Sequence, residues 1–318
     1  MGAIALGQNV RSASAQLPKG ISQEKHDMDI LKRKDIMIKD HYLKSYDGAT
    51  IYVKEKYMSL ENRSAKVVVC NAPAICSHHV FDCPVSDYSL MDHLAKEGFR
   101  VFAYDYRGFG SSYKPPDGRS VTLEVQLKDT EALVNFVLAE TKAKSVSLLG
   151  YGIGTVIACS YAMRHPDQVD ALVLVEIAWK DLATKPPLEA KEMGLRQPNG
   201  YFETSIVSEF LAGLFSTVPP EIRAWFGSTF TAAPVGPTIT LFGAWPLLND
   251  VEKIQASVLI IYGTKSEVTT KADSFNFLSS ISSQIRVIDI LEGAGAIPTI
   301  EKDHYRKVLK DIAWFLSR

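Results

Sequence analysis

Short, largely apolar runs recur along the chain, and longer segments with helical spacing separate them. A brief continuous apolar run is typical of a strand that is buried on both faces of a sheet. Six such runs predict the parallel strands of a central sheet, at residues 67–70, 101–104, 146–149, 172–175, 258–262 and 285–290.

The segments between these runs carry apolar residues along one face of a helix. Such amphipathic spacing places one stripe of each helix against a sheet and leaves the opposite face in water. It predicts helices at residues 88–97, 121–140, 153–164, 271–280 and 301–316. Strands and helices therefore alternate, which is typical of an α/β fold with a doubly wound, mostly parallel sheet.

An antiparallel hairpin is predicted ahead of the alternating elements. Two strand-like segments, residues 35–43 and 50–57, flank the pair Asp47 and Gly48. An Asp-Gly pair favours the positive φ angles of a tight hairpin turn. We expect the hairpin to form an antiparallel edge of the sheet.

Two segments depart from the alternation. Residues 1–30 are polar and aperiodic, which predicts an N-terminal arm. Between residues 179 and 250, prolines repeatedly interrupt short helical stretches. Because a structureless loop of that length is uncommon within a compact domain, we expect an inserted helical cap there. The predicted α/β core then comprises residues 31–178 and 251–318.

Charge balance and run lengths exclude several classes of partner. The 318 residues include 35 Lys and Arg against 36 Asp and Glu, so the chain has no basic field for nucleic acid. No apolar stretch approaches the roughly 20 residues that span a bilayer. The N-terminus has no pattern of a secretion signal, and the four cysteines lack the spacing of a disulfide framework. We expect a cytoplasmic protein that binds neither nucleic acid nor membrane.

Two motifs carry a family resemblance. Residues 150–154 read Gly-Tyr-Gly-Ile-Gly, between a predicted strand and a predicted helix. This arrangement is typical of a nucleophile elbow, in which small residues allow a sharp turn that lifts the central residue above the sheet. Residues 105–112 have the pattern D-x-R-G-x-G-x-S. Together with the element order, these motifs resemble the α/β-hydrolase superfamily over about residues 35–318.

The resemblance implies a catalytic triad, and this chain departs from it at all three positions. The elbow centre is Gly152, where the family has Ser, Cys or Asp. The family's acid follows a strand in the pattern Y-G-x-x-D-x-V, and here residues 262–268 place Ser266 at the acid. The family's histidine lies in G-A-G-H-x-P, and here residues 293–298 place Ala296 at the histidine. The resemblance therefore implies a degenerate triad with no nucleophile and no general base.

The oxyanion hole is also altered in this comparison. The loop after the third strand places Pro73 where the family offers a backbone N–H, and proline has none. The N–H of Ile153, directly after the elbow centre, remains available. We therefore expect an oxyanion site that has lost one of its two donors.

Three functions are compatible with a chain that has the glycine elbow and the predicted cap but not the triad. The first hypothesis is a non-hydrolytic enzyme, a lyase, isomerase or cyclase, that acts on an apolar and possibly polyketide-like small molecule by holding it in a reactive shape. The alternative is an inactive pseudoenzyme that binds a small ligand or a protein partner. The third is residual hydrolysis through a displaced base.

Polar side chains near the elbow are the candidates for a substitute chemistry. His78 and His79 belong to the loop after the third strand, and either one is a general acid or base or else a solvated loop residue. Tyr151 flanks the elbow centre, where its phenol could donate a hydrogen bond to a ligand. Glu267 lies one residue beyond the position of the missing acid and is a pocket candidate or an ordinary loop charge.

Aromatic residues of the predicted cap indicate an apolar ligand. The cap is rich in aromatic side chains, among which Trp225 and Trp245 are candidates to line a pocket. We expect a closed pocket in which Tyr151, His78 or His79 are the few polar contacts. No cluster of His, Cys and Asp has metal-ligand spacing, and the elbow glycines match no nucleotide motif. We therefore expect no metal and no cofactor.

Overall fold

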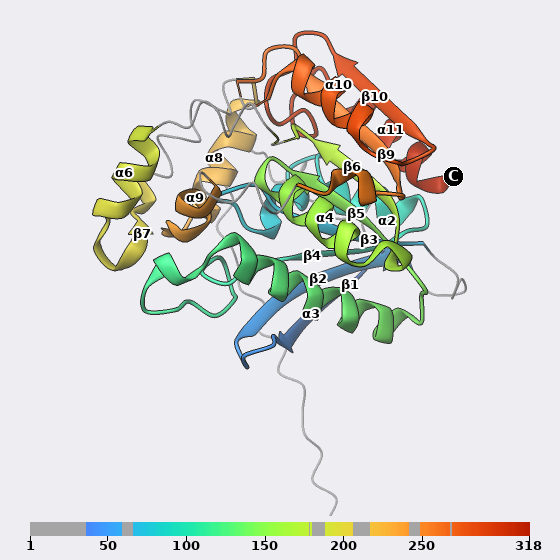
Figure 1. Cartoon of the computed structure of the whole chain (residues 1–318). Helices are drawn as coiled ribbons and strands as arrows, with labels where there is room; N and C mark the ends of the chain where they lie inside the picture. The colour runs from blue at the N-terminus through green and yellow to red at the C-terminus, as the bar shows by residue number, and fades with distance from the viewer. Residues whose placement is uncertain are drawn as a thin grey trace, which may run out of the picture.

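The described part of the chain is built on one eight-stranded sheet. The computed structural model describes residues 36–58, 66–177, 179, 188–205, 217–241, 249–267 and 269–318, so the predicted N-terminal arm lies outside the described residues. The strand order is β1-β2-β4-β3-β5-β6-β9-β10. The predicted fold class, an α/β fold with a mostly parallel sheet, is confirmed (Figure 1).

The predicted hairpin forms one edge of this sheet. β1 (Ile36–Lys44) pairs antiparallel with β2 (Thr50–Met58), and β2 pairs antiparallel with β4. Gly48 lies in the turn with φ of 85°, a conformation that glycine adopts without a steric cost.

The six strands predicted from apolar runs are all present and pair in parallel. Their side chains are buried almost throughout, apart from the edge strand β10, which explains why their sequences do not alternate. The strands are β3 (Val67–Asn71), β4 (Arg100–Tyr104), β5 (Val146–Tyr151), β6 (Val169–Val175), β9 (Ser257–Gly263) and β10 (Arg286–Leu291).

Five helices occupy the predicted segments. They are α2 (Leu90–Lys96), α3 (Leu123–Thr141), α4 (Ile153–Arg164), α10 (Lys271–Ser280) and α11 (Tyr305–Ser317). α3 contacts α4 and α2 contacts α11, and the sheet lies between these two pairs (Figure 1). Within the described residues, no helix combines the length and apolar character needed to cross a bilayer.

One predicted helix boundary is wrong. The amphipathic pattern predicts that the last helix begins at residue 301, whereas α11 begins at Tyr305. The carboxylate of Glu301 instead accepts hydrogen bonds from the backbone N–H groups of Gly295 and Ile297. Glu301 therefore fixes the loop that precedes α11 rather than starting the helix.

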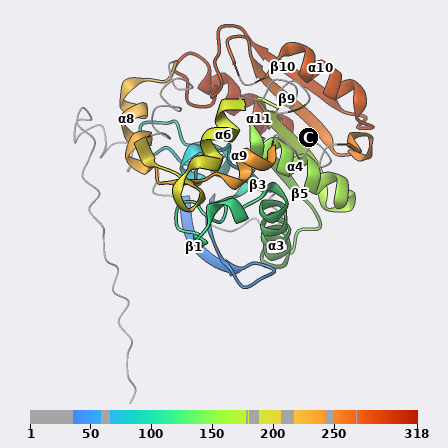
Figure 2. The ribbon, with the colours of Figure 1, turned by 60° about the vertical axis from the view of Figure 1, so that its left-hand side comes forward.

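Short elements gather beside the sheet in the segment predicted to be a cap. They are α6 (Leu188–Arg196), β7 (Tyr201–Phe202), α8 (Pro220–Thr229), β8 (Ala233–Pro234) and α9 (Gly236–Leu241). α9 contacts α6 and α3, and α8 contacts the 3-10 helix η1 (His78–Phe81) (Figures 1 and 2). The division into core and cap stays a prediction. The other 3-10 helices are η2 (Gly118–Ser120), η3 (Pro166–Gln168), η4 (Pro198–Gly200) and η6 (Val251–Lys253).

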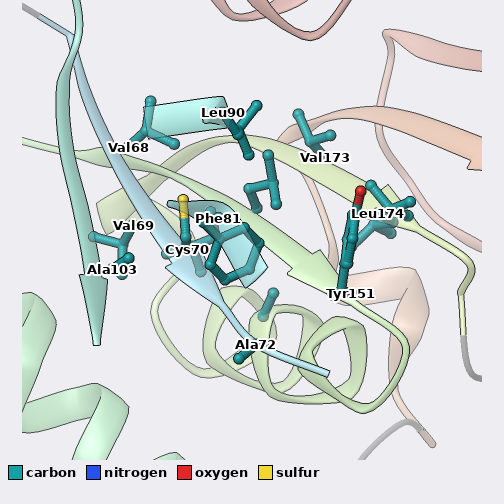
Figure 3. Packing of buried hydrophobic residues seen from close by; sticks show 14 of the residues in the cluster. Val68, Val69, Cys70, Ala72, Phe81, Leu90, Ala103, Tyr151, Val173 and Leu174 are labelled. Atoms are coloured by element: carbon teal, nitrogen blue, oxygen red, sulfur yellow. The ribbon is translucent and has the colours of Figure 1, made fainter. Parts of the chain in front are cut away.

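The main hydrophobic core lies between the sheet and its helices. Val68, Val69 and Cys70 of β3 pack with Ala103 of β4, and Val173 of β6 belongs to the same cluster (Figure 3). These side chains are fully buried. The core thereby holds the carboxyl ends of the central strands in fixed positions, and those ends carry the candidate site.

Candidate active site

The elbow predicted at residues 150–154 has the backbone of a sharp strand-to-helix turn. Gly152 links β5 to α4 with φ of 47° and ψ of −115°. Its N–H donates to the carbonyl of Val175 over 3.0 Å, which ties the elbow to the end of β6. A Cβ on Gly150 would lie 2.5 Å from the oxygen of Gly154, so the close turn requires glycine there.

Within the described part of the chain, few atoms lie close to the point where a side chain on Gly152 would begin. Among the described residues, a Cβ added to Gly152 would have one neighbour within 4 Å, the Cβ of Pro73 at 3.7 Å, which is an ordinary contact. Gly152 and Pro73 are both partly exposed. A small side chain at Gly152 would therefore meet no steric conflict with the described residues.

The other two degenerate positions lie at the same edge of the sheet. Ser266 follows β9 and Ala296 follows β10, and both are partly exposed. The N–H of Lys265 donates to the carbonyl of Ala294 over 2.8 Å, so the loops after β9 and β10 are in direct contact. Because carboxyl ends of parallel strands meet at one edge of a sheet, Gly152, Ser266 and Ala296 lie at the same edge.

The oxyanion positions also lie at this edge. Pro73 lies beside the elbow, since a Cβ added to Gly152 would be 3.7 Å from its Cβ, and as a proline it has no N–H to donate. Ile153 is the first residue of α4, so its N–H has no acceptor within the helix. Asn71, at the end of β3, is a structural residue, because its amide donates to the carbonyl of Leu149 and accepts from the hydroxyl of Tyr104.

A buried carboxyl group that the sequence did not single out lies among these positions. Glu176 directly follows β6, has φ of 54° and is 2% exposed. Its Oε1 accepts a hydrogen bond of 2.7 Å from the N–H of Gly263, and its carboxyl is also hydrogen-bonded by Ser266. Its Oε2 is buried and has no hydrogen-bond partner among the described residues.

The surroundings of Glu176 favour its neutral form. Burial raises the pKa of Glu176 to about 8, the hydrogen bonds from Ser266 and Gly263 lower it, and the nearby Glu301 raises it. A signal for this residue was present, since an acidic residue directly after a buried apolar strand lies at the functional edge of the sheet.

The two candidate histidines have different environments. His78 is 3% exposed, so the interpretation as a solvated loop residue is wrong for it. Its Nδ1 is 2.7 Å from Oδ1 of Asp105, which also accepts from the backbone N–H of His78. Its Nε2 is buried without a partner among the described residues. Asp105 is the aspartate of the D-x-R-G-x-G-x-S motif, for which the sequence predicted no role.

Asp105 is ionised despite its burial. Burial raises its pKa, but the hydrogen bonds from His78 and Ser111 outweigh that effect and hold the pKa below its usual value. The pair thus joins a carboxylate to the Nδ1 side of an imidazole, which orients the ring.

His79 lies between the loop and the predicted cap. Its ring packs edge-on against Trp225 of α8, with 5.8 Å between ring centres. Burial and the neighbouring His78 lower the pKa of His79 to about 4, so the ring is neutral near pH 7. Trp225 is partly buried, whereas Trp245 lies outside the described residues.

Tyr151 does not fit its predicted role. Its side chain is 2% exposed, and its hydroxyl donates to Oγ1 of Thr299 over 2.5 Å. The ring packs in the core near Phe81, with 5.7 Å between ring centres (Figure 3). The prediction of a ligand contact is therefore corrected, because alternate residues of a strand point to opposite faces and Tyr151 points into the core. Glu267 is exposed.

Comparisons with known proteins agree with this geometry. The model of a family described as alpha/beta hydrolase fold matches residues 68–293. The AB hydrolase superfamily protein YisY of Bacillus subtilis is 23% identical over 266 residues, which cover 80% of this chain and 91% of that protein. An esterase from Exiguobacterium antarcticum has a similar structure, with a TM-score of 0.68 and 21% identity over 88% of this chain and all of that chain.

Other relatives carry varied activities in their names. A putative 2-succinyl-6-hydroxy-2,4-cyclohexadiene-1-carboxylate synthase of Bacillus subtilis is 28% identical over 101 residues, or 32% of this chain and 35% of that protein. Further relatives are named as hydrolases, lipases or acyltransferases. The matches establish the family, and the structural likeness at this identity establishes the fold.

Proposed function

The chain belongs to the α/β-hydrolase fold family, and from this premise we propose that it is a non-hydrolytic enzyme of that family. It acts as a lyase, isomerase or cyclase on an apolar, polyketide-like small molecule that is held over Gly152. The observation that carries this proposal is the unfilled space at the elbow centre, where a Cβ on Gly152 would meet just the Cβ of Pro73 among the described residues.

The residues at the elbow argue against ordinary hydrolysis. Acyl transfer needs an atom that attacks carbon and a base that takes its proton. Gly152 has no attacking atom and Ala296 has no basic atom. Without both groups, at most the residual rate due to binding and partial oxyanion stabilisation remains.

The open position at Gly152 supports the binding of a small molecule. Empty apolar space in a protein costs about 24 cal/mol per Å³, so an unfilled site is a cost unless it is occupied in use. Pro73 and Ala296, both partly exposed, are apolar residues at this edge of the sheet. Reactions such as elimination, isomerisation or cyclisation proceed when a substrate is held in one shape with a few hydrogen bonds, and they need no nucleophile.

The test uses the purified full chain. We expect no turnover of p-nitrophenyl esters above the rate with heat-denatured protein. We also expect native mass spectrometry to detect a bound apolar molecule, and liquid chromatography to detect its conversion when the extracted compound meets fresh protein. Recovery of the compound unchanged would favour the pseudoenzyme alternative. Protein that never carries or binds an apolar compound would refute the proposal.

A second candidate function rests on His78. With Nδ1 held by Asp105 and Nε2 without a partner among the described residues, the ring has the arrangement of a general base for water. In that case the wild type would hydrolyse p-nitrophenyl esters, and His78→Gln would abolish the turnover. His165→Gln is the matched control, because His165 lies at the opposite end of α4 from the elbow.

We also propose a reducing, cytoplasmic location. The four cysteines Cys70, Cys76, Cys83 and Cys159 are free and buried. Burial raises the pKa of Cys76 to about 12, so its thiol is unreactive near pH 7.

A further inference from the structure

Glu301 and Glu176, two buried glutamates near the site, differ in the hydrogen-bond partners of their carboxyl oxygens. Glu301 is 1% exposed, and each of its oxygens accepts a backbone N–H, from Gly295 at 2.9 Å and from Ile297 at 3.2 Å. Glu176 is equally buried, but its hydrogen bonds leave Oε2 without a partner among the described residues. A buried oxygen in this condition requires an explanation.

The carboxyl group of Glu176 lies at the site rather than elsewhere in the core. Gly152 donates to the carbonyl of Val175, the residue before Glu176, so the two residues are side by side on adjacent strands. Ser266, which hydrogen-bonds the carboxyl, is itself partly exposed. The carboxyl therefore lies next to a partly exposed residue at this edge of the sheet.

Among the described residues, no cationic side chain is paired with this carboxyl. Glu301 and Tyr151 are the titratable groups that interact with it, and burial holds the pKa of Tyr151 far above neutrality. An isolated buried carboxyl group keeps its proton, and here the raised pKa of about 8 agrees with that expectation.

The hydrogen bonds determine which oxygen carries the proton. Oε1 accepts from the N–H of Gly263, so it acts as the carbonyl oxygen. The proton then lies on Oε2, which makes Oε2–H a buried donor that lacks an acceptor in the described residues.

We propose that Glu176 acts as a neutral carboxylic acid whose Oε2–H donates a hydrogen bond to a carbonyl or enol oxygen of the bound molecule. This inference rests on the proposed function and names its substrate class, apolar compounds with an acceptor oxygen. Cations and purely hydrocarbon compounds do not satisfy this donor.

The test compares two fluorescent probes. One is the naphthyl ketone 6-propionyl-2-(dimethylamino)naphthalene, whose emission shifts to the red when its carbonyl accepts a hydrogen bond. The other is the matched 6-propyl compound, which has no carbonyl. At about pH 6, where Glu176 is protonated, we expect the wild type to bind the ketone about five-fold more tightly than the propyl compound. The advantage should vanish at about pH 9.5, above the pKa of Glu176.

Variants separate the donor from a structural role. Glu176→Leu should remove the ketone's advantage at both pH values. Glu176→Gln should keep it at both, because the amide oxygen accepts from Gly263 and the amide NH₂ takes the place of Oε2. Glu301→Gln is the matched control and should keep the wild-type pH dependence, because both oxygens of Glu301 are bound to the backbone.

The outcomes distinguish this inference from the proposed function. If the wild type binds both probes equally at both pH values, the pocket stands and the role of Glu176 is refuted. The same holds if Glu176→Leu keeps the preference. If neither probe binds, the proposed function fails, and this inference fails with it.

Discussion

Gly152 has the backbone conformation of a nucleophile elbow, but it has no side chain that could act as the nucleophile. Its φ of 47° lies in the left-handed region, which costs an L-residue about 1–2 kcal/mol and costs glycine nothing. Glycine therefore holds this turn without backbone strain. What remains is a turn that presents a backbone N–H and an opening to a ligand.

Glu176 gives the first prediction at the scale of single residues. The native state holds the proton up to about pH 8, whereas the unfolded chain releases it near the usual 4.5. The contribution of this bound proton to the free energy of unfolding is therefore fully present below pH 4.5. It is lost as the pH rises towards 8. At about 1.4 kcal/mol per pH unit, this loss reaches up to about 3 kcal/mol at pH 7.

Glu176→Gln does not titrate, so it should be about as stable as the wild type at pH 4.5 and up to about 3 kcal/mol more stable at pH 7. Urea unfolding of both proteins at the two pH values measures the difference. A difference that does not change with pH would mean that the native carboxyl titrates normally.

At the scale of elements, glycines set how closely α4 approaches the sheet. A Cβ on Gly154 would lie 2.2 Å from the carbonyl oxygen of Asn71, so Gly154→Ala would force α4 away from β3. We expect a loss of about 3 kcal/mol in the free energy of unfolding. Gly227→Ala is the matched control, because Gly227 lies in α8 with nothing within 4 Å of its Cβ.

The control should gain up to about 1 kcal/mol, the usual preference of a helix for alanine. Thermal unfolding of the two variants checks the pair. Equal stability of Gly154→Ala and the wild type would mean that α4 and β3 are less closely packed than described.

Glu301 gives a prediction for the loop between β10 and α11. Its carboxylate accepts the N–H groups of Gly295 and Ile297, and Glu301→Ala would leave both donors buried without an acceptor. Each buried unsatisfied group costs about 1–3 kcal/mol, so we expect a loss of at least about 2 kcal/mol in chemical unfolding. Unchanged stability would show that water or the loop itself replaces the carboxylate.

For the whole molecule, the sequence predicted the sheet and its helices because both depend on local patterns. Buried runs and amphipathic stripes placed every core strand and helix within a few residues. The start of α11 was wrong, because the pattern does not reveal that Glu301 is needed by the preceding loop.

The site was less predictable, because its contacts join distant strand ends. The elbow, Ser266 and Ala296 were found through motifs. Glu176 was missed because its partner Gly263 is 87 residues away in the sequence. His78 and Asp105 are likewise paired across 27 residues, so the sequence singled out His78 but not the aspartate that holds its ring. The motif likewise does not reveal that Tyr151 is buried, with its hydroxyl bonded to Thr299.

We infer that an apolar small molecule occupies the space over Gly152. The affinity of the naphthyl ketone for the variants Gly152→Ala and Gly152→Trp measures whether it does. Both variants share the cost of a side chain at positive φ, but alanine adds one ordinary contact whereas tryptophan fills the space. We expect near wild-type affinity for Gly152→Ala and a loss of about ten-fold or more for Gly152→Trp, with both variants folded. Wild-type affinity in a folded Gly152→Trp variant would contradict it.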